Sequence, residues 1–402
     1  MEKGAAYYCF CAEEKLEKER GEQRAKNLPT KYSGRCLALD KKSIQKNLDN
    51  GEQHVVRLKI PEEGTTSFND IIYGKVGVEN KNIDHQILLK SDGFPTYNLA
   101  NVVDDHLMKI SHVIRGEEWL PSTPKHILLY RAFGWQAPQF AHLPLLLNPD
   151  RSKLSKRQGD VAVEDYLRQG YLPEALLNFV ALLGWNPKGD QEVYSIGELI
   201  KLFELESINK AGAVFNKEKL YWMNGEYIRK KPLNELTKLC IPYLMEAELI
   251  SERQKAKKQY IITATGQEIG VDWLKKIIAT ERERMKRLDE IPQFSAFFFK
   301  NKLEYDKETL IWKETDAKET KRSLECLIEY LTNFKEKDFA KENLEQKIKE
   351  FLGQRGIAAG NALWPMRVAL SGLKASPSPF EIAEVLGKEK TLSRLKDALQ
   401  KF

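Results

Sequence analysis

Hydrophobic positions recur with two different spacings, and the change of spacing divides the chain near residue 162. Before it, short apolar runs alternate with Gly and Pro turns, a pattern typical of strands in a mixed α/β arrangement. The runs that predict strands are residues 5–10, 55–60, 71–78, 87–89, 112–114 and 143–147. From Val163 onward apolar residues recur every three or four positions, which predicts amphipathic helices as far as the C-terminus.

Residues 91–110 predict a helix that presents polar groups near its beginning. Pro95 favours a turn, and apolar residues then recur at helical spacing. Those apolar residues are Leu99, Val102, Val103, Leu107 and Ile110. Tyr97 and Asn101 are four positions apart, so we expect them on one face near the N-terminal end of this helix.

A strand at 112–114 and a further helix come next, as in an open parallel sheet. Arg115 directly follows the strand, at the edge where such sheets bind ligands. The helix is expected to have Thr123 as its N-cap, Pro124 at its first position and Gly134 after its last turn. In this order the elements predict the second half of a doubly wound parallel domain.

A basic loop follows the apolar run 143–147. Lys153 and Lys156 lie three positions apart in a Lys-Leu-Ser-Lys-Arg stretch, with the turn residues Pro149 and Gly159 on either side. Two lysines in a flexible loop can contact one polyanion, and each contact at ~4 Å gains roughly 4 kcal/mol before desolvation at an effective dielectric of about 20. Such a loop could stabilise a pyrophosphate leaving group in a transition state. Considered alone, the stretch is more often a solvated surface loop.

The composition is that of a chain with packed cores. It has 402 residues, 42% of them hydrophobic and 30% charged, so about two to four domains are expected. No apolar run reaches the roughly 18 residues of a membrane span, and residues 1–25 contain no signal core. Five cysteines without a regular framework indicate a reducing compartment, expected to be the cytoplasm or alternatively a mitochondrial or plastid matrix. The net charge of +6 permits an RNA partner without requiring one.

Residues 91–135 together with residues 153–157 closely resemble the class I glutamyl-tRNA synthetases, whose signature loop KMSKS appears here as KLSKR. The resemblance runs from about Gly4 to the C-terminus, and its motifs are long and in order. It implies a glutamate–tRNA ligase that uses ATP with Mg²⁺ to form glutamyl-adenylate. The enzyme would then transfer the glutamyl group to the 3′ end of tRNA(Glu), acting as a monomer without a membrane partner.

The resemblance also implies which residues contact the substrates. Arg115 would bind the carboxylate side chain of glutamate through two parallel hydrogen bonds, which a lysine cannot reproduce. A surface ion pair is the alternative role for an isolated arginine. The rest of the glutamate pocket would be Tyr97, Asn98, Leu99, Ala100, Asn101 and Trp119. ATP would be contacted by Glu118, Lys153, Leu154, Ser155, Lys156 and Arg157, with Lys153 and Lys156 as the catalytic residues.

In fold, the resemblance implies an α/β part followed by an all-α part. Residues 1–90 would form an α/β insertion with a truncated start, which contacts the tRNA acceptor stem. Residues 91–162 would be the second half of the class I doubly wound nucleotide-binding domain, with the KLSKR loop. Residues 163–232 would form a helical stem-contact region, and residues 233–402 a helical anticodon-binding region.

The HIGH motif of these synthetases has no counterpart in the chain. None of the six histidines stands in a His-x-Gly-His arrangement, and no glycine-rich adenylate loop occurs. The N-terminal half of the catalytic domain, which carries that motif, is therefore expected to be missing. The alternatives to an active ligase are a catalytically inactive tRNA-binding remnant and one piece of a split synthetase. A related enzyme that glutamylates a modified base fits less well, because such relatives lack the long helical C-terminus.

Cys9, Cys11 and Cys36 form a Cys-x-Cys…Cys set in the first part of the chain. Some of the family's members bind zinc here, with a histidine at the position that Ala38 occupies. A structural zinc site has four ligands, so three thiols without a metal are favoured. Zinc with Tyr32 or Asp40 as the fourth ligand is the alternative.

Overall fold

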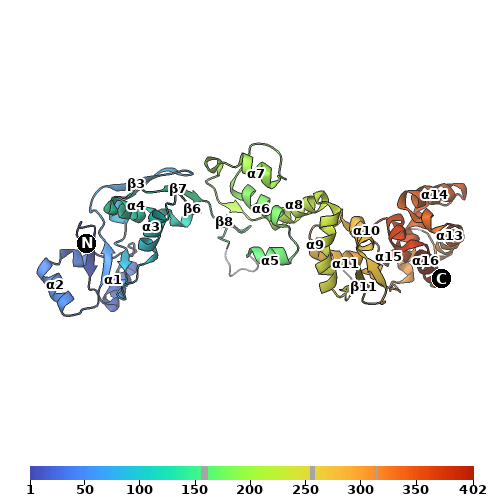
Figure 1. Cartoon of the computed structure of the whole chain (residues 1–402), viewed down its shortest axis with the longest axis horizontal. Helices are drawn as coiled ribbons and strands as arrows, with labels where there is room; N and C mark the ends of the chain where they lie inside the picture. Colours follow the sequence, from blue (N-terminus) through green and yellow to red (C-terminus); the bar gives the residue numbers. More distant parts are fainter. Residues whose placement is uncertain (155–161, 254–258, 314) are drawn as a thin grey trace. The chain divides into compact units, whose positions relative to one another are not determined.

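The computed structural model describes residues 1–154, 162–253, 259–313 and 315–402 (Figure 1). They form two compact units. Unit 1 consists of Met1–Leu154 and Val180–Phe215. Unit 2 consists of the described residues 162–179 together with those of Asn216–Phe402. Within these ranges, every helix is too short or too polar to cross a lipid bilayer.

Unit 1 begins with an antiparallel sheet of order β1-β2-β5, which is separate from the sheet that carries Arg115. Its strands are β1 (Ala6–Cys9), β2 (Val55–Leu58) and β5 (Ile87–Leu89). Helices α1 (Glu13–Ala25) and α2 (Lys41–Asp49) lie between β1 and β2 in the chain. All three strands were predicted.

The second sheet of unit 1 has the order β4-β3-β7-β6. Its strands are β3 (Thr65–Asp70), β4 (Gly74–Glu79), β6 (His112–Gly116) and β7 (Gln139–Leu143). β3, β7 and β6 are parallel, whereas β4 pairs with β3 in the antiparallel sense. Helices α3 (Tyr97–Leu107) and α4 (Thr123–Phe133) pack together, and α4 also packs on β3 (Figure 1). Their shared core includes Val102, Ile127, Leu129 and Phe140. The expected α/β domain is confirmed.

Two predicted strands of this unit were wrong in extent. Residues 71–78 are a turn followed by β4, because Asp70 accepts the N–H groups of Ile72 and Tyr73 and fixes the turn. Residues 143–147 are divided at Pro144, which has no N–H to donate to a ladder. β7 therefore ends at Leu143, and β8 (Leu146–Leu147) pairs with β9 (Ala213–Val214) instead.

The helical pattern that starts at Val163 is broken into α5 (Val163–Arg168) and α6 (Pro173–Gly184). Gly170 between them has φ +82°, and a Cβ there would lie 2.6 Å from the backbone nitrogen of Leu288. Only glycine fits this close approach without a shift of the backbone. Further along, Ser195 caps α7 (Ile196–Leu202) in a capping box with Glu198.

The rest of unit 2 is mostly helical. Its helices are α8 (Lys217–Lys230), α9 (Leu233–Glu246), α10 (Val271–Glu281), α11 (Ile291–Ser295), α12 (Lys307–Leu310), α13 (Ala317–Thr332), α14 (Lys341–Gln354), α15 (Ala359–Ser371) and α16 (Pro379–Leu399). α15 and α16 pack together, and α13 packs on both (Figure 1).

One sheet in this unit was not predicted. It is antiparallel and consists of β10 (Ile250–Glu252), β11 (Gln259–Ile262) and β12 (Glu268–Gly270). The expectation of helices alone after residue 233 is thus corrected. Strands of three or four residues are too short to show a spacing of two in the sequence.

A buried arginine holds the C-terminal helices of unit 2 together. Arg394 of α16 is 2% exposed, and its guanidinium donates to the carbonyl groups of Leu370, Phe297 (2.6 Å) and Lys300 (2.7 Å). Leu370 lies in the last turn of α15, where carbonyl groups lack helical partners. Burial lowers the pKa of Arg394 to about 10, so the group remains charged at neutral pH.

Replacing Arg394 with methionine should destabilise unit 2 by about 3 kcal/mol, because three buried carbonyl groups lose their donor. Urea unfolding followed by circular dichroism measures the loss. Lys396→Met is the matched control, since Lys396 lies exposed on the same helix. A midpoint equal to that of the control would show that the three hydrogen bonds contribute little to stability.

Candidate active site

Arg115 is the charged residue around which the candidate active site is built. It lies on β6 opposite His142 of β7, because the two parallel strands pair in that register. Its Nε donates a hydrogen bond to His142 Nε2 (3.1 Å), and its Nη2 donates to Thr123 Oγ1 (2.7 Å). Nη2 also lies 3.3 Å from His126 Nδ1. Side chains from β7 and α4 therefore hold the guanidinium.

Arg115 forms no ion pair with any carboxylate in the part of the chain that the structure describes. Burial lowers its pKa, while nearby Tyr97 and Asp105 act in the opposite direction. The ring of Trp119 lies 5.5 Å from the guanidinium carbon. A partly buried cation in these surroundings attracts an anionic ligand, because the ligand replaces the solvation that the cation has lost.

A buried carboxylate orients His142 from the side opposite to Arg115. Asp70 Oδ2 lies 2.6 Å from His142 Nδ1, and both side chains are fully buried. Asp70 also accepts the backbone N–H groups of Ile72 (3.0 Å), Tyr73 (2.9 Å) and His142 (3.2 Å). Burial lowers the pKa of His142, although the hydrogen bond to Asp70 opposes this effect. The ring is therefore neutral at pH 7.

His126 contacts Arg115 from α4 and is 1% exposed. Burial lowers the pKa of His126 to about 3, and the charge of Arg115 adds to the effect. Its Nε2 lies 3.0 Å from Asn98 Oδ1, so a neutral ring that donates there presents the lone pair of Nδ1 to Arg115. Asn98, predicted in the glutamate pocket, is thus connected to Arg115 through His126.

The other predicted pocket residues lie on α3 and next to it. The rings of Tyr97 and Trp119 are 4.8 Å apart, and Tyr97 is 53% exposed. Asn101 is half-buried, and its Oδ1 has no hydrogen-bond partner among the described residues. Leu99 packs against the hydrophobic core, which indicates a structural contribution, and its neighbour Ala100 is half-buried.

The predicted ATP-binding residues are described only in part. Lys153 Nζ lies 3.2 Å from Glu118 Oε1, and both side chains are exposed. An exposed ion pair contributes little to stability, so it can open when a phosphate competes for the lysine. Leu154 donates its N–H to the carbonyl of Leu146, which anchors the start of the loop. The predicted residues Ser155, Lys156 and Arg157 lie outside the described residues.

Thr123 has a different role from the predicted one. α4 begins at Thr123 directly after a 3₁₀ helix at Glu117–Ser122, so this residue does not cap the helix. Its Oγ1 donates to the carbonyl of Trp119 (3.0 Å) and accepts from Arg115. The hydroxyl group is therefore part of the site.

Three residues that contact this site were not predicted: Asp70, His126 and His142. They come from β3, α4 and β7, and no two of them are close in the sequence. A buried strand is recognised in a sequence by its apolar residues, so a single polar residue within it gives little signal of its own. Asp70 and His142, each one position before an apolar run, were the available clues.

The three predicted cysteines lie together in unit 1. The Sγ atoms of Cys9, Cys11 and Cys36 all lie within 4.8 Å of one another, and none forms a disulfide. The hydroxyl oxygen of Tyr32 is 3.4 Å from Cys11 Sγ and accepts the N–H of Cys36 (3.1 Å). Asp40, the other suggested ligand, accepts the N–H of Ser43 as the cap of α2. The geometry therefore favours Tyr32 as a fourth group.

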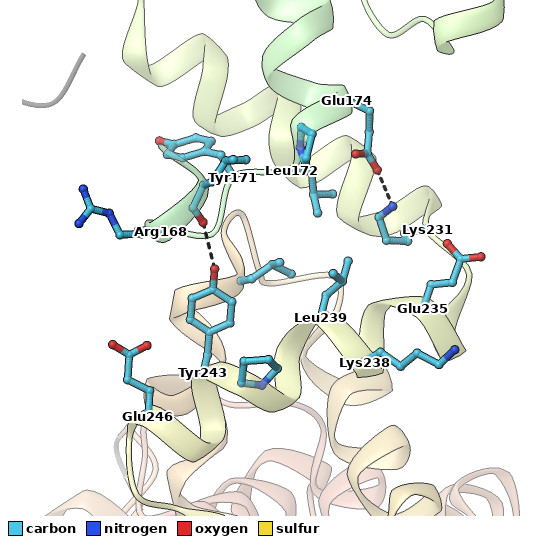
Figure 2. A pocket seen from close by; sticks show the side chains of 14 residues that line it. Arg168, Tyr171, Leu172, Glu174, Lys231, Glu235, Lys238, Leu239, Tyr243 and Glu246 are labelled. Carbon is cyan, nitrogen blue, oxygen red and sulfur yellow. Dashed lines mark hydrogen bonds and ion pairs between the residues drawn. The ribbon is translucent and has the colours of Figure 1, made fainter. Parts of the chain in front are cut away.

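Unit 2 contains a cavity of about 920 Å³ between α9 and the segment that joins α5 to α6 (Figure 2). Leu172 and Leu239 contribute its apolar wall. Lys231 pairs with Glu174 at its edge, and the Tyr243 hydroxyl donates to the carbonyl of Leu167 (3.2 Å). Histidine and cysteine are absent from its described lining.

Two family models match the chain. The catalytic domain of "tRNA synthetases class I (E and Q)" matches residues 1–222, and an "anticodon binding domain" matches residues 235–399. The first match contains Arg115 and the lysine loop, and the second contains most of the helices of unit 2.

Relatives and solved structures agree with these matches. The glutamate–tRNA ligase of Alkaliphilus metalliredigens is 44% identical over 98% of this chain and 77% of its own length. That of Chlorobaculum parvum is 44% identical over 99% of this chain and 78% of its own. A glutamate–tRNA ligase from Elizabethkingia meningosepticum, crystallised with its amino acid, superposes with a TM-score of 0.83 at 34% identity. That alignment covers 99% of this chain and 80% of the crystallised one.

The buried neutral His126 should make unit 1 less stable in acid. Its pKa is about 3 in the folded state and about 6.5 in the unfolded chain. The unfolded state thus binds more protons between these values, and stability falls as pH falls below 6.5. From pH 7.5 to 5.5 the loss from His126 is about 1.4 kcal/mol.

The variant His126→Gln should therefore lose about 1.4 kcal/mol less than the wild type over that pH range. Pulsed hydrogen–deuterium exchange across a urea series, read on peptides of α4, measures the stability of unit 1. An identical pH dependence in both proteins would mean that His126 is protonated in the folded state.

Proposed function

Because the chain belongs to the glutamate–tRNA ligase family of class I aminoacyl-tRNA synthetases, we propose that Arg115 binds the side-chain carboxylate of glutamate. The activity of the family is to activate glutamate with ATP as glutamyl-adenylate, release pyrophosphate, and transfer the glutamyl group to the 3′-terminal ribose of tRNA. The chemistry depends on positioning and on charge stabilisation, without a covalent nucleophile on the protein.

The observation that carries the proposal is that Arg115 is held by hydrogen bonds while its charge has no carboxylate partner. Its Nε and Nη2 are held by uncharged groups, and no carboxylate among the described residues pairs with the guanidinium. A ligand carboxylate can therefore contact the guanidinium and supply the missing negative charge. Tyr97 and Trp119, whose rings lie side by side near Arg115, would enclose the aliphatic part of glutamate.

For ATP, we propose that Lys153 and Lys156 bind the phosphates and that Glu118 lies near the nucleoside. The exposed Glu118–Lys153 pair supports this role, because Lys153 has no strong competitor for a phosphate oxygen. ATP would be bound with Mg²⁺ as a substrate. The lysines would act most strongly as the pyrophosphate leaves, since charge builds up there in the transition state.

We propose that tRNA(Glu) contacts several parts of the chain. Residues 1–90 would contact the acceptor stem, residues 163–232 the stem region, and residues 233–402 the anticodon. The match of an anticodon-binding model to residues 235–399 supports the last assignment. Residues 91–162 would contribute the catalytic groups.

Arg115→Lys tests the glutamate site. The variant should bind glutamate about 30- to 150-fold more weakly, because a lysine replaces a two-point contact to a carboxylate by a single one (~2–3 kcal/mol). Isothermal titration calorimetry of the 402-residue chain with glutamate measures this change. Arg131→Lys, the same substitution at an exposed position of α4, should bind glutamate as the wild type does. Equal affinity of all three proteins would remove Arg115 from the pocket.

We also propose that Cys9, Cys11, Cys36 and Tyr32 hold a structural zinc ion, which reverses the preference that the sequence alone suggested. The three Sγ atoms are close enough to share one ion, and the Tyr32 hydroxyl lies beside Cys11. The ion would connect β1 to the 3₁₀ helix at Arg35–Ala38 and has no part in catalysis.

The purified chain should therefore contain about one zinc ion per molecule by elemental analysis, as a single four-ligand site requires. Cys36→Ser should lose most of the metal, and unit 1 should become easier to unfold because metal binding is coupled to folding. Cys240→Ser, which changes a buried thiol of unit 2, is the control and should keep the zinc. A metal-free wild type with three reactive thiols would contradict the proposal.

A further inference from the structure

Asp70 determines which groups donate and which accept in the hydrogen bonds around Arg115. Its carboxylate accepts three backbone N–H groups, so its position is fixed by the backbone of β3, β7 and the turn after β3. A carboxylate can only accept, and the hydrogen on His142 must therefore be on Nδ1. The lone pair of Nε2 is then directed at Arg115 Nε.

We propose that Asp70 and His142, together with Thr123 and His126, position Arg115 and thereby set the preference of the site for glutamate over glutamine. The inference rests on the proposed role of Arg115 as the group that binds the substrate's side chain. All four are positioning residues, since they act on the substrate through Arg115.

The four groups fix Arg115 without neutralising it. A carboxylate in direct contact with the guanidinium would satisfy its charge and compete with a substrate carboxylate. Here the negative charge of Asp70 lies behind the imidazole ring of His142. His126 and Thr123 contribute a lone pair of a neutral ring and a hydroxyl oxygen. The positive charge therefore remains available to the substrate.

The unneutralised positive charge of Arg115 is what allows the site to distinguish glutamate from glutamine. The two side chains have nearly the same shape, so a pocket cannot separate them by size alone. A fixed guanidinium in a partly buried site favours a carboxylate over an amide, because the charged pair gains more there than a neutral hydrogen bond does. An arginine free to turn would lose part of that gain to ordering.

The imidazole rings of His142 and His126 both remain neutral at pH 7. His142 faces Asp70 of β3, Arg115 of β6, Glu118 and the ring of His126. His126 faces Arg115, His142 and its own neighbour Lys125. Burial and the charge of Arg115 oppose protonation of both rings, whereas Asp70 and Glu118 act in the opposite direction on His142. Protonation would remove the lone pair that Arg115 uses.

Asp70→Asn is the first test. Its amide nitrogen would donate to His142 Nδ1 and transfer the ring hydrogen to Nε2, so that two donors face each other at Arg115. Calorimetry on the 402-residue chain should show at least tenfold weaker binding of glutamate, with binding of glutamine changed less than threefold. Asp105→Asn is the control, since Asp105 influences Arg115 by charge without a hydrogen bond to it. It should not weaken glutamate binding.

A double-variant cycle separates positioning from general damage to the fold. In an Arg115→Lys background, Asp70→Asn should weaken glutamate binding less than twofold further, because its effect passes through Arg115. Full additivity of the two changes would overturn the inference. Thr123→Val gives an independent test should Asp70→Asn fail to fold. It should lower the glutamate preference at least fivefold, and Thr123→Ser should restore it.

The outcomes distinguish the inference from the proposal on which it rests. Normal glutamate binding by Arg115→Lys would refute the proposed pocket, and the inference with it. Weak binding by Arg115→Lys combined with an unchanged glutamate preference in Asp70→Asn and Thr123→Val would refute the inference alone. A wild-type chain that binds no glutamate would refute both.

Discussion

The buried contact between Asp70 and His142 is the interaction on which the candidate site depends. An isolated carboxylate inside a protein would be very unfavourable, and this one is tolerated because each of its oxygens accepts hydrogen bonds. Its partners come from the turn after β3 and from β7, so one side chain joins the ends of two parallel strands. The third strand, β6, is connected through Arg115. The carboxyl edge of the sheet is thus held together by the groups that form the site.

The positions of the candidate substrate-binding groups and of the helical region along the chain agree with the activity of the family. Groups suited to binding a small charged substrate lie in unit 1, within the region matched by the class I catalytic model. The cavity in unit 2 has an apolar wall and one ion pair, Lys231–Glu174, at its edge. Each unit has its own hydrophobic core, so the candidate site and the C-terminal helices are packed separately.

The sequence predicted the elements whose signals are local. The helical spacing around Val102 and the short strand before Arg115 were confirmed, because each is determined by neighbouring residues. The strand that carries His142 was placed several residues too late, since the apolar run after it continues across Pro144. The pairing of Asp70 with His142 joins residues 72 positions apart, and no local pattern contains it. The role of Thr123 was hidden because a threonine before a proline looks like a helix cap.

The separations along the chain have a consequence for how the site is assembled. Arg115 and Thr123 are 8 positions apart, Arg115 and His142 are 27 apart, and Asp70 and His142 are 72 apart. Closing a longer loop costs more entropy, and the cost rises with the logarithm of its length. The contact between strand β6 and helix α4 therefore closes the shortest loop, and the contact between Asp70 and His142 closes the longest. The contact that orients the imidazole beside Arg115 is thus the one with the largest loop entropy to overcome.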